Sequence, residues 1–220
     1  MQIYLNNPVC IITLPLPIVE VACNHDADLT FTSGTAGPPR AARLTHGNNG
    51  ANIKQSKAIE ILKPSDLIYG VLPLFHIFGL NVVMTTGPAV GATVMLMQRF
   101  DPHTAVESIS GRQVAVMPGA PEMWTTFTHF DKLPTNTFAS VRLALSGASR
   151  PPAATFQAMR ECFGVEVAEG YGLTKTSATA ATSLGASIQP GSVGRAFDGV
   201  EIRLINTEGH DALVGDIGEV

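Results

Sequence analysis

From residue 28 onward, hydrophobic and polar positions follow two different periodic patterns along this chain. Short runs of β-branched and aliphatic residues predict strands, and apolar residues recurring every three or four positions predict helices that bury one face. Strands followed by helices in repeated alternation are typical of a sheet covered by helices. The pattern therefore predicts an α/β fold.

The predicted elements follow directly from these runs. The strands are expected at Leu29–Phe31, Ala42–Leu44, Leu67–Leu72, Thr93–Met97, Val114–Val116, Val141–Leu145, Val165–Ala168 and Val200–Ile205. The helices are expected at His46–Ile61, Ile77–Thr86, Pro102–Ser110, Pro121–Phe130 and Pro151–Phe163. Asp101 before Pro102 is a typical helix start, and Gly111 and Gly164 are placed to end two helices in the left-handed conformation.

The uncharged run from Leu80 to Met97 is almost long enough to cross a bilayer. Thr85 to Pro88 and the pair Gly91-Ala92 interrupt it, however, and divide it into pieces of ordinary core length. We therefore expect a buried helix, a turn and a strand here, and no integral membrane segment.

Composition and charge narrow the class of protein. The 220 residues are 45% hydrophobic and 15% charged, which is typical of a globular chain. The net charge of -4 and the scattered cations disfavour nucleic acid as a partner. Three widely spaced cysteines indicate neither a disulfide framework nor a zinc site, and the N-terminal stretch lacks the positive region of a secretory signal. We expect a cytoplasmic protein.

The loop from Thr32 to Arg40 is rich in groups that suit a polyphosphate. Gly34 and Gly37 let the backbone turn sharply and bring its N–H groups close to an anion. Hydroxyl groups and one cation add donors and positive charge: Thr32, Ser33, Thr35 and Arg40. Two prolines follow Gly37, so the loop is not a Walker A loop, which needs Lys and a hydroxyl residue there. Composition alone leaves an ordinary solvated loop open.

Four later segments bear on whether this loop is a phosphate-binding loop. They are Pro73–His76, Ser146–Ser149, Glu169–Lys175 and Gly191–Arg195. In order and spacing, the five segments resemble the adenylate-forming enzymes: acyl-CoA synthetases, peptide-synthetase adenylation domains and luciferases. The resemblance is strongest to fatty-acyl-CoA ligases and runs from about residue 28 to the C-terminus.

The resemblance implies a fold, a reaction and a division of the chain. Residues 28–220 would form the central part of the family's large AMP-binding domain, a mostly parallel sheet flanked by helices, after an unassigned segment 1–27. A carboxylate would attack the α-phosphate of ATP, and CoA would capture the acyl-adenylate. ATP or AMP, CoA, a carboxylic acid, expected to be a fatty acid, and Mg²⁺ are the implied ligands. The family's ribose-binding aspartate and its C-terminal domain with a catalytic lysine lie beyond the equivalent of Val220.

The resemblance also assigns roles to individual residues. In the first loop, Thr32, Ser33, Gly34, Thr35, Ala36 and Gly37 would hold the β- and γ-phosphates together with Arg40, where the family has lysine. The adenine would lie against Gly147, Ala148, Gly170, Tyr171 and Gly172. Catalytic roles would fall to His76 at the carboxylate, Thr174 at the α-phosphate, and Lys175. No metal ligand is assigned.

Several of these residues have a structural alternative. His76 taken alone reads as a core histidine beside Phe75 and Phe78, and the other motifs in order favour the site role; Gly147 with Ala148 also reads as a strand-to-helix turn. Met123 and Trp124 resemble the segment that borders the family's acyl tunnel, with core packing as the alternative.

Lys175 departs most from the family, which has a magnesium-binding glutamate here. An ammonium group cannot coordinate a cation, although it can supply positive charge to phosphates. Ala36 and Ala41 also replace a hydroxyl residue and a glycine of the family loop. These departures leave a non-catalytic nucleotide- or acyl-binding protein, or a truncated gene product, as the alternative to an acid–thiol ligase.

Overall fold

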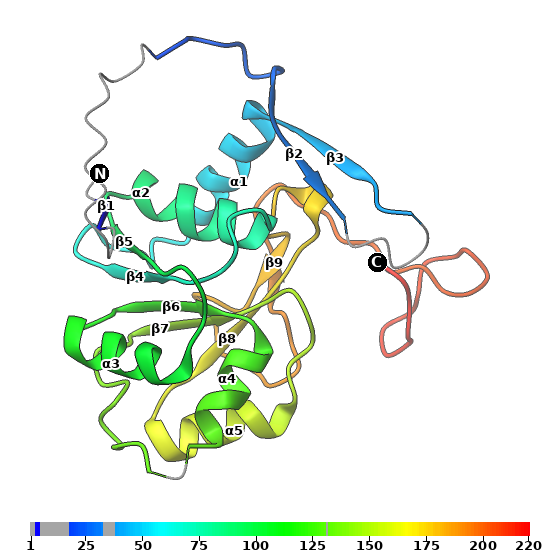
Figure 1. Ribbon diagram of the computed structural model, residues 1–220. Helices are drawn as coiled ribbons and strands as arrows, with labels where there is room; N and C mark the ends of the chain where they lie inside the picture. The colour runs from blue at the N-terminus through cyan, green and yellow to red at the C-terminus, as the bar shows by residue number, and fades with distance from the viewer. Residues whose placement is uncertain (1–2, 5–17, 33–37, 131) are drawn as a thin grey trace.

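The computed structural model describes residues 3–4, 18–32, 38–130 and 132–220. An eight-stranded sheet in the order β1-β5-β4-β6-β7-β8-β9-β10 forms its centre (Figure 1). Neighbours from β1 to β8 pair in parallel, whereas β8–β9 and β9–β10 are antiparallel. The strands are β1 (Ile3–Tyr4), β4 (Leu67–Gly70), β5 (Thr93–Leu96), β6 (Val116–Gly119), β7 (Leu143–Ser146), β8 (Val167–Tyr171), β9 (Ala181–Thr182) and β10 (Arg195–Ala196). The predicted α/β fold with a mostly parallel sheet is confirmed.

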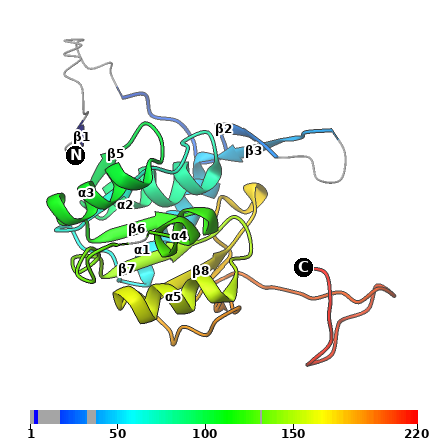
Figure 2. The ribbon, with the colours of Figure 1, turned by 60° about the horizontal axis from the view of Figure 1, so that its bottom comes forward.

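Two groups of helices cover opposite faces of this sheet (Figures 1 and 2). One face carries α3 (Pro102–Arg112), α4 (Pro121–Thr128) and α5 (Ala153–Phe163). The other carries α1 (His46–Ala58), the π-helix η1 (Phe78–Thr86) and the short α2 (Gly87–Ala89). Fully buried aromatic side chains pack beneath α3 to α5, among them Trp124, Phe127 and Phe138. Burial on both faces explains why the central strands are apolar throughout.

A separate antiparallel hairpin projects from this body (Figure 2). It consists of β2 (Asp26–Phe31) and β3 (Ala41–Thr45). Thr45 caps the following helix α1, since its side chain accepts from the Asn48 backbone N–H at 3.1 Å. The hairpin thus leads the chain from the loop after Thr32 directly into α1.

The apolar run after residue 80 is divided as expected into a buried helix, a turn and the strand β5. The helix is a π-helix of 9 residues, a rare form that hydropathy does not reveal. Among the described residues, no helix is long and apolar enough to cross a membrane.

Two local predictions are wrong. Gly111 lies inside α3, and Gln113 ends the helix instead with a φ of 57°. The Gln113 side-chain amide donates to the Ser110 carbonyl at 2.7 Å, which stabilises that end without glycine. Val200–Ile205 forms no strand: within it only Ile205 makes isolated bridges, to Asp211 and Glu219. Asp101 and Gly164 act as the predicted caps.

Candidate functional site

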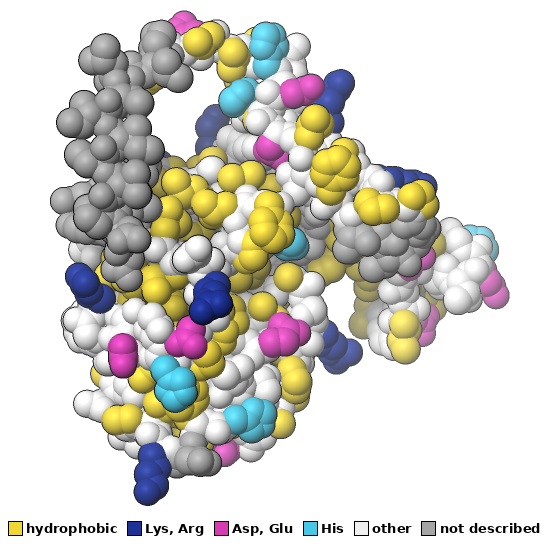
Figure 3. Space-filling model, viewed as in Figure 1, with side chains coloured by type: hydrophobic (Ala, Val, Ile, Leu, Met, Phe, Trp, Pro, Cys, Tyr) yellow, Lys and Arg dark blue, Asp and Glu magenta, His cyan; other side chains and the backbone are white. Residues whose placement is uncertain are grey.

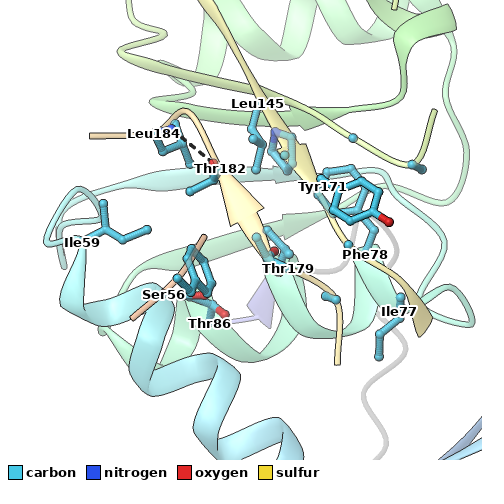
Figure 4. Close-up of a pocket in the computed structure, with 18 of the residues that line it drawn as sticks. Ser56, Ile59, Ile77, Phe78, Thr86, Leu145, Tyr171, Thr179, Thr182 and Leu184 are labelled. Carbon is cyan, nitrogen blue, oxygen red and sulfur yellow. Dashed lines mark hydrogen bonds between the residues drawn. The ribbon is translucent and has the colours of Figure 1, made fainter. Parts of the chain in front are cut away.

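A cavity of about 250 Å³ lies between the sheet and the helices α1 and η1 (Figure 4). Its floor is made of side chains from the sheet: Ile68, Val116, Pro118, Leu143 and Leu145. Its roof comes from the helices and the segment that follows α1, including Ser56, Ile59, Val82 and Thr86. His76 is the only titratable side chain among the described lining residues other than Tyr171, so the cavity suits an uncharged, apolar group.

The carboxyl ends of β7 and β8 form the open end of this cavity. Gly147 and Ala148 follow β7, while Gly170 and Tyr171 end β8. Ends of adjacent parallel strands lie at the same sheet edge, which is where α/β proteins commonly bind ligands. The predicted adenine-contacting residues are therefore brought together at one place.

Close packing at this end leaves no room for larger side chains. A Cβ on Gly147 would lie 3.3 Å from the Phe78 ring and 3.4 Å from the Gly170 carbonyl oxygen. Ala148 has a φ of 75°, which is strained for a residue other than glycine. Figure 4 places Phe78 and Tyr171 at the same end of the cavity. Gly147 is buried here, whereas Ala148 is exposed and Tyr171 is half-buried.

Thr174 also lines the cavity, from the short 3₁₀ turn η2 (Thr174–Thr176) that follows β8. Lys175 is exposed next to it and does not line the cavity. The chain returns from this turn so tightly that a Cβ on Gly172 would lie 1.5 Å from the Ala178 carbonyl oxygen. Only glycine fits at position 172.

His76 lies at the mouth, between β4 and η1. The side chain is exposed and lines the cavity, and its Nδ1 accepts from the Phe78 backbone N–H at 3.2 Å. The interpretation of His76 as a core histidine is therefore wrong. The bond to Phe78 leaves Nε2 available to a ligand.

The predicted phosphate loop is described only at its two ends. The Thr32 backbone N–H donates to the Arg40 carbonyl at 2.8 Å, and the Arg40 N–H donates to the Thr32 hydroxyl at 3.4 Å. These bonds close the base of the loop. Ser33, Gly34, Thr35, Ala36 and Gly37 lie outside the described residues.

Side chains that could ligate a metal ion do not cluster in the described part of the chain. No group of three or more His, Cys, Asp or Glu side chains is close enough there to hold a metal ion. At position 175, where the resemblance leads us to expect a metal-binding glutamate, the chain has a lysine, whose ammonium donates and cannot coordinate.

Glu169 is a buried acid beside the site that sequence reasoning did not single out. Its side chain is 5% exposed and its carboxylate accepts from the Gly191 backbone N–H at 2.9 Å. The Ser183 hydroxyl also accepts from the Glu169 N–H at 2.8 Å. Glu169 thus joins β8, just before Gly170, to the glycine-rich segment around residue 191.

Other lining residues were also missed, chiefly Phe78, Val82 and Thr86 of η1. Their spacing of four was visible in the apolar run, but it does not distinguish a cavity wall from a core face.

Trp124 proves to be a core residue, fully buried on the opposite face of the sheet. Met123 lines a second hollow of about 980 Å³ that contains none of the predicted site residues. In the view of Figure 3, apolar side chains are exposed at several places on the surface; the exposed apolar residues include Leu29, Phe31 and Phe75.

The fold and the site define an α/β protein with an apolar cavity that opens at the carboxyl edge of a parallel sheet. The chain belongs to the AMP-binding enzyme family, which matches residues 13–220.

Several curated proteins are similar over most of the chain. Long-chain-fatty-acid–CoA ligase of Bacillus subtilis (strain 168) is 30% identical over 210 residues, which are 93% of this chain and 38% of the relative. 4-Coumarate–CoA ligase of Pinus taeda is 30% identical over 90% of this chain and 38% of its own length. Indoleacetate–CoA ligase of Aromatoleum aromaticum is 30% identical over 87% of this chain and 38% of its own length. The chain thus spans little more than a third of these relatives.

Solved structures agree with the fold. The crystal structure of ATP-bound MatB from Rhodopseudomonas palustris is 26% identical, with a TM-score of 0.86, covering 93% of this chain and 40% of that one. O-succinylbenzoate CoA synthetase (MenE) from Bacillus subtilis, in complex with ATP and magnesium ion, is 26% identical with a TM-score of 0.77, covering 91% and 42%.

Proposed function

We propose that this chain binds ATP or AMP together with a hydrophobic carboxylic acid, and that it belongs to an acid–thiol ligase that forms an acyl-adenylate and then a CoA thioester. The observation that carries this proposal is the single cavity shared by His76, Gly147, Tyr171 and Thr174. Glycines and Tyr171 line it where β7 and β8 end, and apolar side chains of the sheet and η1 line much of the rest. That arrangement suits a nucleotide at the strand ends and an acyl group along the apolar side chains.

Each side chain has a chemical part in this proposal. The Tyr171 ring would stack on adenine, against the backbone at Gly147 and Ala148. The Thr174 hydroxyl would donate to the α-phosphate, where negative charge develops as the carboxylate attacks. His76 would orient that carboxylate at the mouth through Nε2. The acid would extend over the apolar floor formed by the sheet.

The remaining ligands and boundaries stay predictions. The loop from Thr32 to Gly37, with Arg40, would hold the β- and γ-phosphates. CoA would be the acyl acceptor, residues 28–220 the partial AMP-binding domain after segment 1–27, and the cytoplasm the compartment. Relatives named for a long-chain fatty acid and for 4-coumarate leave an aliphatic and an aromatic acid as outcomes of a substrate screen.

A second candidate is a binding protein that keeps the cavity without the chemistry. Lys175 favours it, because the family's metal-binding carboxylate is replaced by a cation. Ala36 and Arg40 in the phosphate loop favour it as well. Pyrophosphate exchange that requires a carboxylic acid distinguishes the enzyme, and nucleotide binding without exchange identifies the binding protein.

Calorimetry of ATP and AMP binding tests the shared core of both candidates. Tyr171→Ala removes the stacking surface and should weaken AMP binding by about tenfold. Tyr171→Phe keeps the ring and should bind within about twofold of the original chain. Binding of neither nucleotide by the unaltered chain, or equal binding by the two variants, contradicts the proposed site.

A further inference from the structure

The turn from Leu173 to Ala180 connects β8 to β9 and carries Thr174 and Lys175 (the 173–180 turn). Its second half has an unusual backbone. Ser177 and Ala178 have φ angles of 55° and 93°, although neither is glycine. Two consecutive residues in this region persist only where the surroundings hold them.

Bonds within the turn secure mainly its first half. The Leu173 N–H donates to the Thr176 hydroxyl at 2.9 Å, and the Thr176 N–H donates to the Leu173 carbonyl at 3.1 Å. The carbonyls of Ser177 and Thr179 instead receive bonds from outside the turn. Within the turn, the Ser177 N–H donates to the Thr174 carbonyl at 3.3 Å and the Thr176 hydroxyl contacts the Ala178 carbonyl at 3.2 Å, so the strained half depends largely, not wholly, on neighbouring elements.

Two buried asparagines supply those bonds, one from each helix above the cavity. Asn81 of η1 is 1% exposed and its side-chain amide donates to the Ser177 carbonyl. Asn52 is 5% exposed, the only buried residue in the described helix α1, and its amide donates to the Thr179 carbonyl at 2.6 Å. A buried amide is costly unless it is bonded, so each contact is specific.

The orientation of the Asn81 amide is itself set by η1. The Thr86 hydroxyl donates to the Asn81 carbonyl at 2.9 Å, so the Thr85 hydroxyl, 2.5 Å from Asn81 Oδ1, can donate to the amide oxygen. The amide oxygen is thereby occupied, and the amide nitrogen faces Ser177. The same helix lines the cavity through Phe78, Val82 and Thr86. One rigid element thus borders the cavity and fixes the turn.

We propose that Asn52 and Asn81 are positioning residues, which hold the 173–180 turn so that Thr174 faces the phosphates of a nucleotide in the cavity. The inference rests on the proposed nucleotide-binding function. Neither asparagine needs to contact the nucleotide, because each acts through the carbonyl that it binds.

Hydrogen exchange and calorimetry on the full chain test this inference with Asn52→Leu and Asn81→Leu, which keep similar volume but lose the donor. The matched control is Asn49→Leu in the same helix α1, since the Asn49 amide donates to Asp28 at 2.6 Å and not to the turn. Amides of residues 173–180 should exchange at least tenfold faster in both test variants and at the original rate in the control. Amides of β6, in the core, report whether each variant is folded.

The ligand comparison separates positioning from general destabilisation. The affinity for ATP should fall by about tenfold in the two test variants. Their affinity for adenosine, which lacks phosphates, should stay within about twofold of the affinity of the original chain for adenosine. Unchanged exchange in the turn of both variants overturns the inference, as does an equal loss for ATP and adenosine. If the unaltered chain binds no nucleotide, the proposed function fails. Faster hydrogen exchange confined to the 173–180 turn would still show that the two asparagines hold the turn.

Discussion

Asp66, 3% exposed at the start of β4, accepts from the guanidinium of Arg142 at the start of β7. Arg142 Nε lies 2.9 Å from Asp66 Oδ1, and a second guanidinium nitrogen also donates to the Ile61 carbonyl at 2.8 Å. The Lys63 N–H completes the shell around Asp66 Oδ2 at 2.7 Å. This ion pair therefore joins the sheet to the segment after α1, where Ile61 lines the cavity.

Arg142→Met should destabilise the fold by about 3 kcal/mol, because Asp66 would keep a buried charge without its cationic partner. Urea unfolding at pH 7 measures the loss. Arg160→Met is the control, since Arg160 and Glu166 are both more than half exposed and 4.0 Å apart, and it should cost less than about 1 kcal/mol. Equal losses of unfolding free energy in the two variants would show that burial does not make the Asp66–Arg142 pair contribute more than an exposed pair.

Tyr69 should make the protein sensitive to alkali. Burial raises the pKa of its hydroxyl from 10.0 to about 12, with a smaller contribution from the negative charge of Asp101. The neutral form is favoured in the folded state, so its contribution to stability is complete below pH 10 and is lost as the pH rises from 10 to 12. Tyr69→Phe should remove about 1.4 kcal/mol of the stability difference between pH 8 and pH 11.

Tyr69→Phe should also be tolerated near neutral pH. The Tyr69 hydroxyl is buried without a hydrogen-bond partner among the described residues, so its removal leaves no group unpaired. Urea midpoints at pH 8 and pH 11 decide both points. A steep alkaline loss that persists unchanged in the variant would assign the titration to another group.

Glu169 should support nucleotide binding through Gly191. Glu169→Ala leaves the Gly191 N–H unpaired and should weaken ATP binding by about fivefold, whereas Glu169→Gln keeps an acceptor oxygen and should bind within about twofold of the original chain. Calorimetry measures both. Glu166→Ala, an exposed acid just before the same strand, is the control. Equal ATP affinities of the Glu169→Ala and Glu169→Gln variants would show that the bond from the Gly191 N–H to residue 169 does not affect ATP binding.

Lys175 should determine whether ATP binding responds to magnesium. The original chain should bind ATP with little dependence on Mg²⁺, and Lys175→Glu should create such a dependence, because a carboxylate can coordinate the ion. Lys175→Met, which removes the charge without adding a ligand, is the control. Calorimetry with and without Mg²⁺ measures the effect, and a Glu variant indifferent to the ion would place Lys175 away from the metal position.

Gly172→Ala should disrupt the turn that carries Thr174. Its Cβ would lie 1.5 Å from the Ala178 carbonyl oxygen, so the backbone of the turn must move. We expect a loss of about 2 kcal/mol or more in unfolding free energy and a loss of ATP binding. Gly50→Ala in α1, where a Cβ meets nothing within 4 Å, should be neutral or stabilising by up to about 1 kcal/mol. Melting temperature and calorimetry compare the two.

Much of the fold could be predicted because strong local signals agreed with the tertiary environment. The central strands are apolar on both faces, and Asp101 and Gly164 mark helix ends by local backbone chemistry. Short elements could not be predicted, because β9 and β10 have 2 residues each and depend on their neighbours. The segment Val200–Ile205 shows the converse: β propensity does not make a strand without a partner.

The sequence by itself determined the family and the order of the site motifs, because glycine, hydroxyl and aromatic residues recur at spacings that their backbone chemistry requires. Only the tertiary structure decided which of them meet. It put His76, Gly147, Tyr171 and Thr174 on one cavity and Trp124 in the core. It also revealed the bonds of Asn52 and Asn81, since contacts between residues 127 and 96 positions apart depend on how sheet and helices pack. Local patterns do not contain that packing.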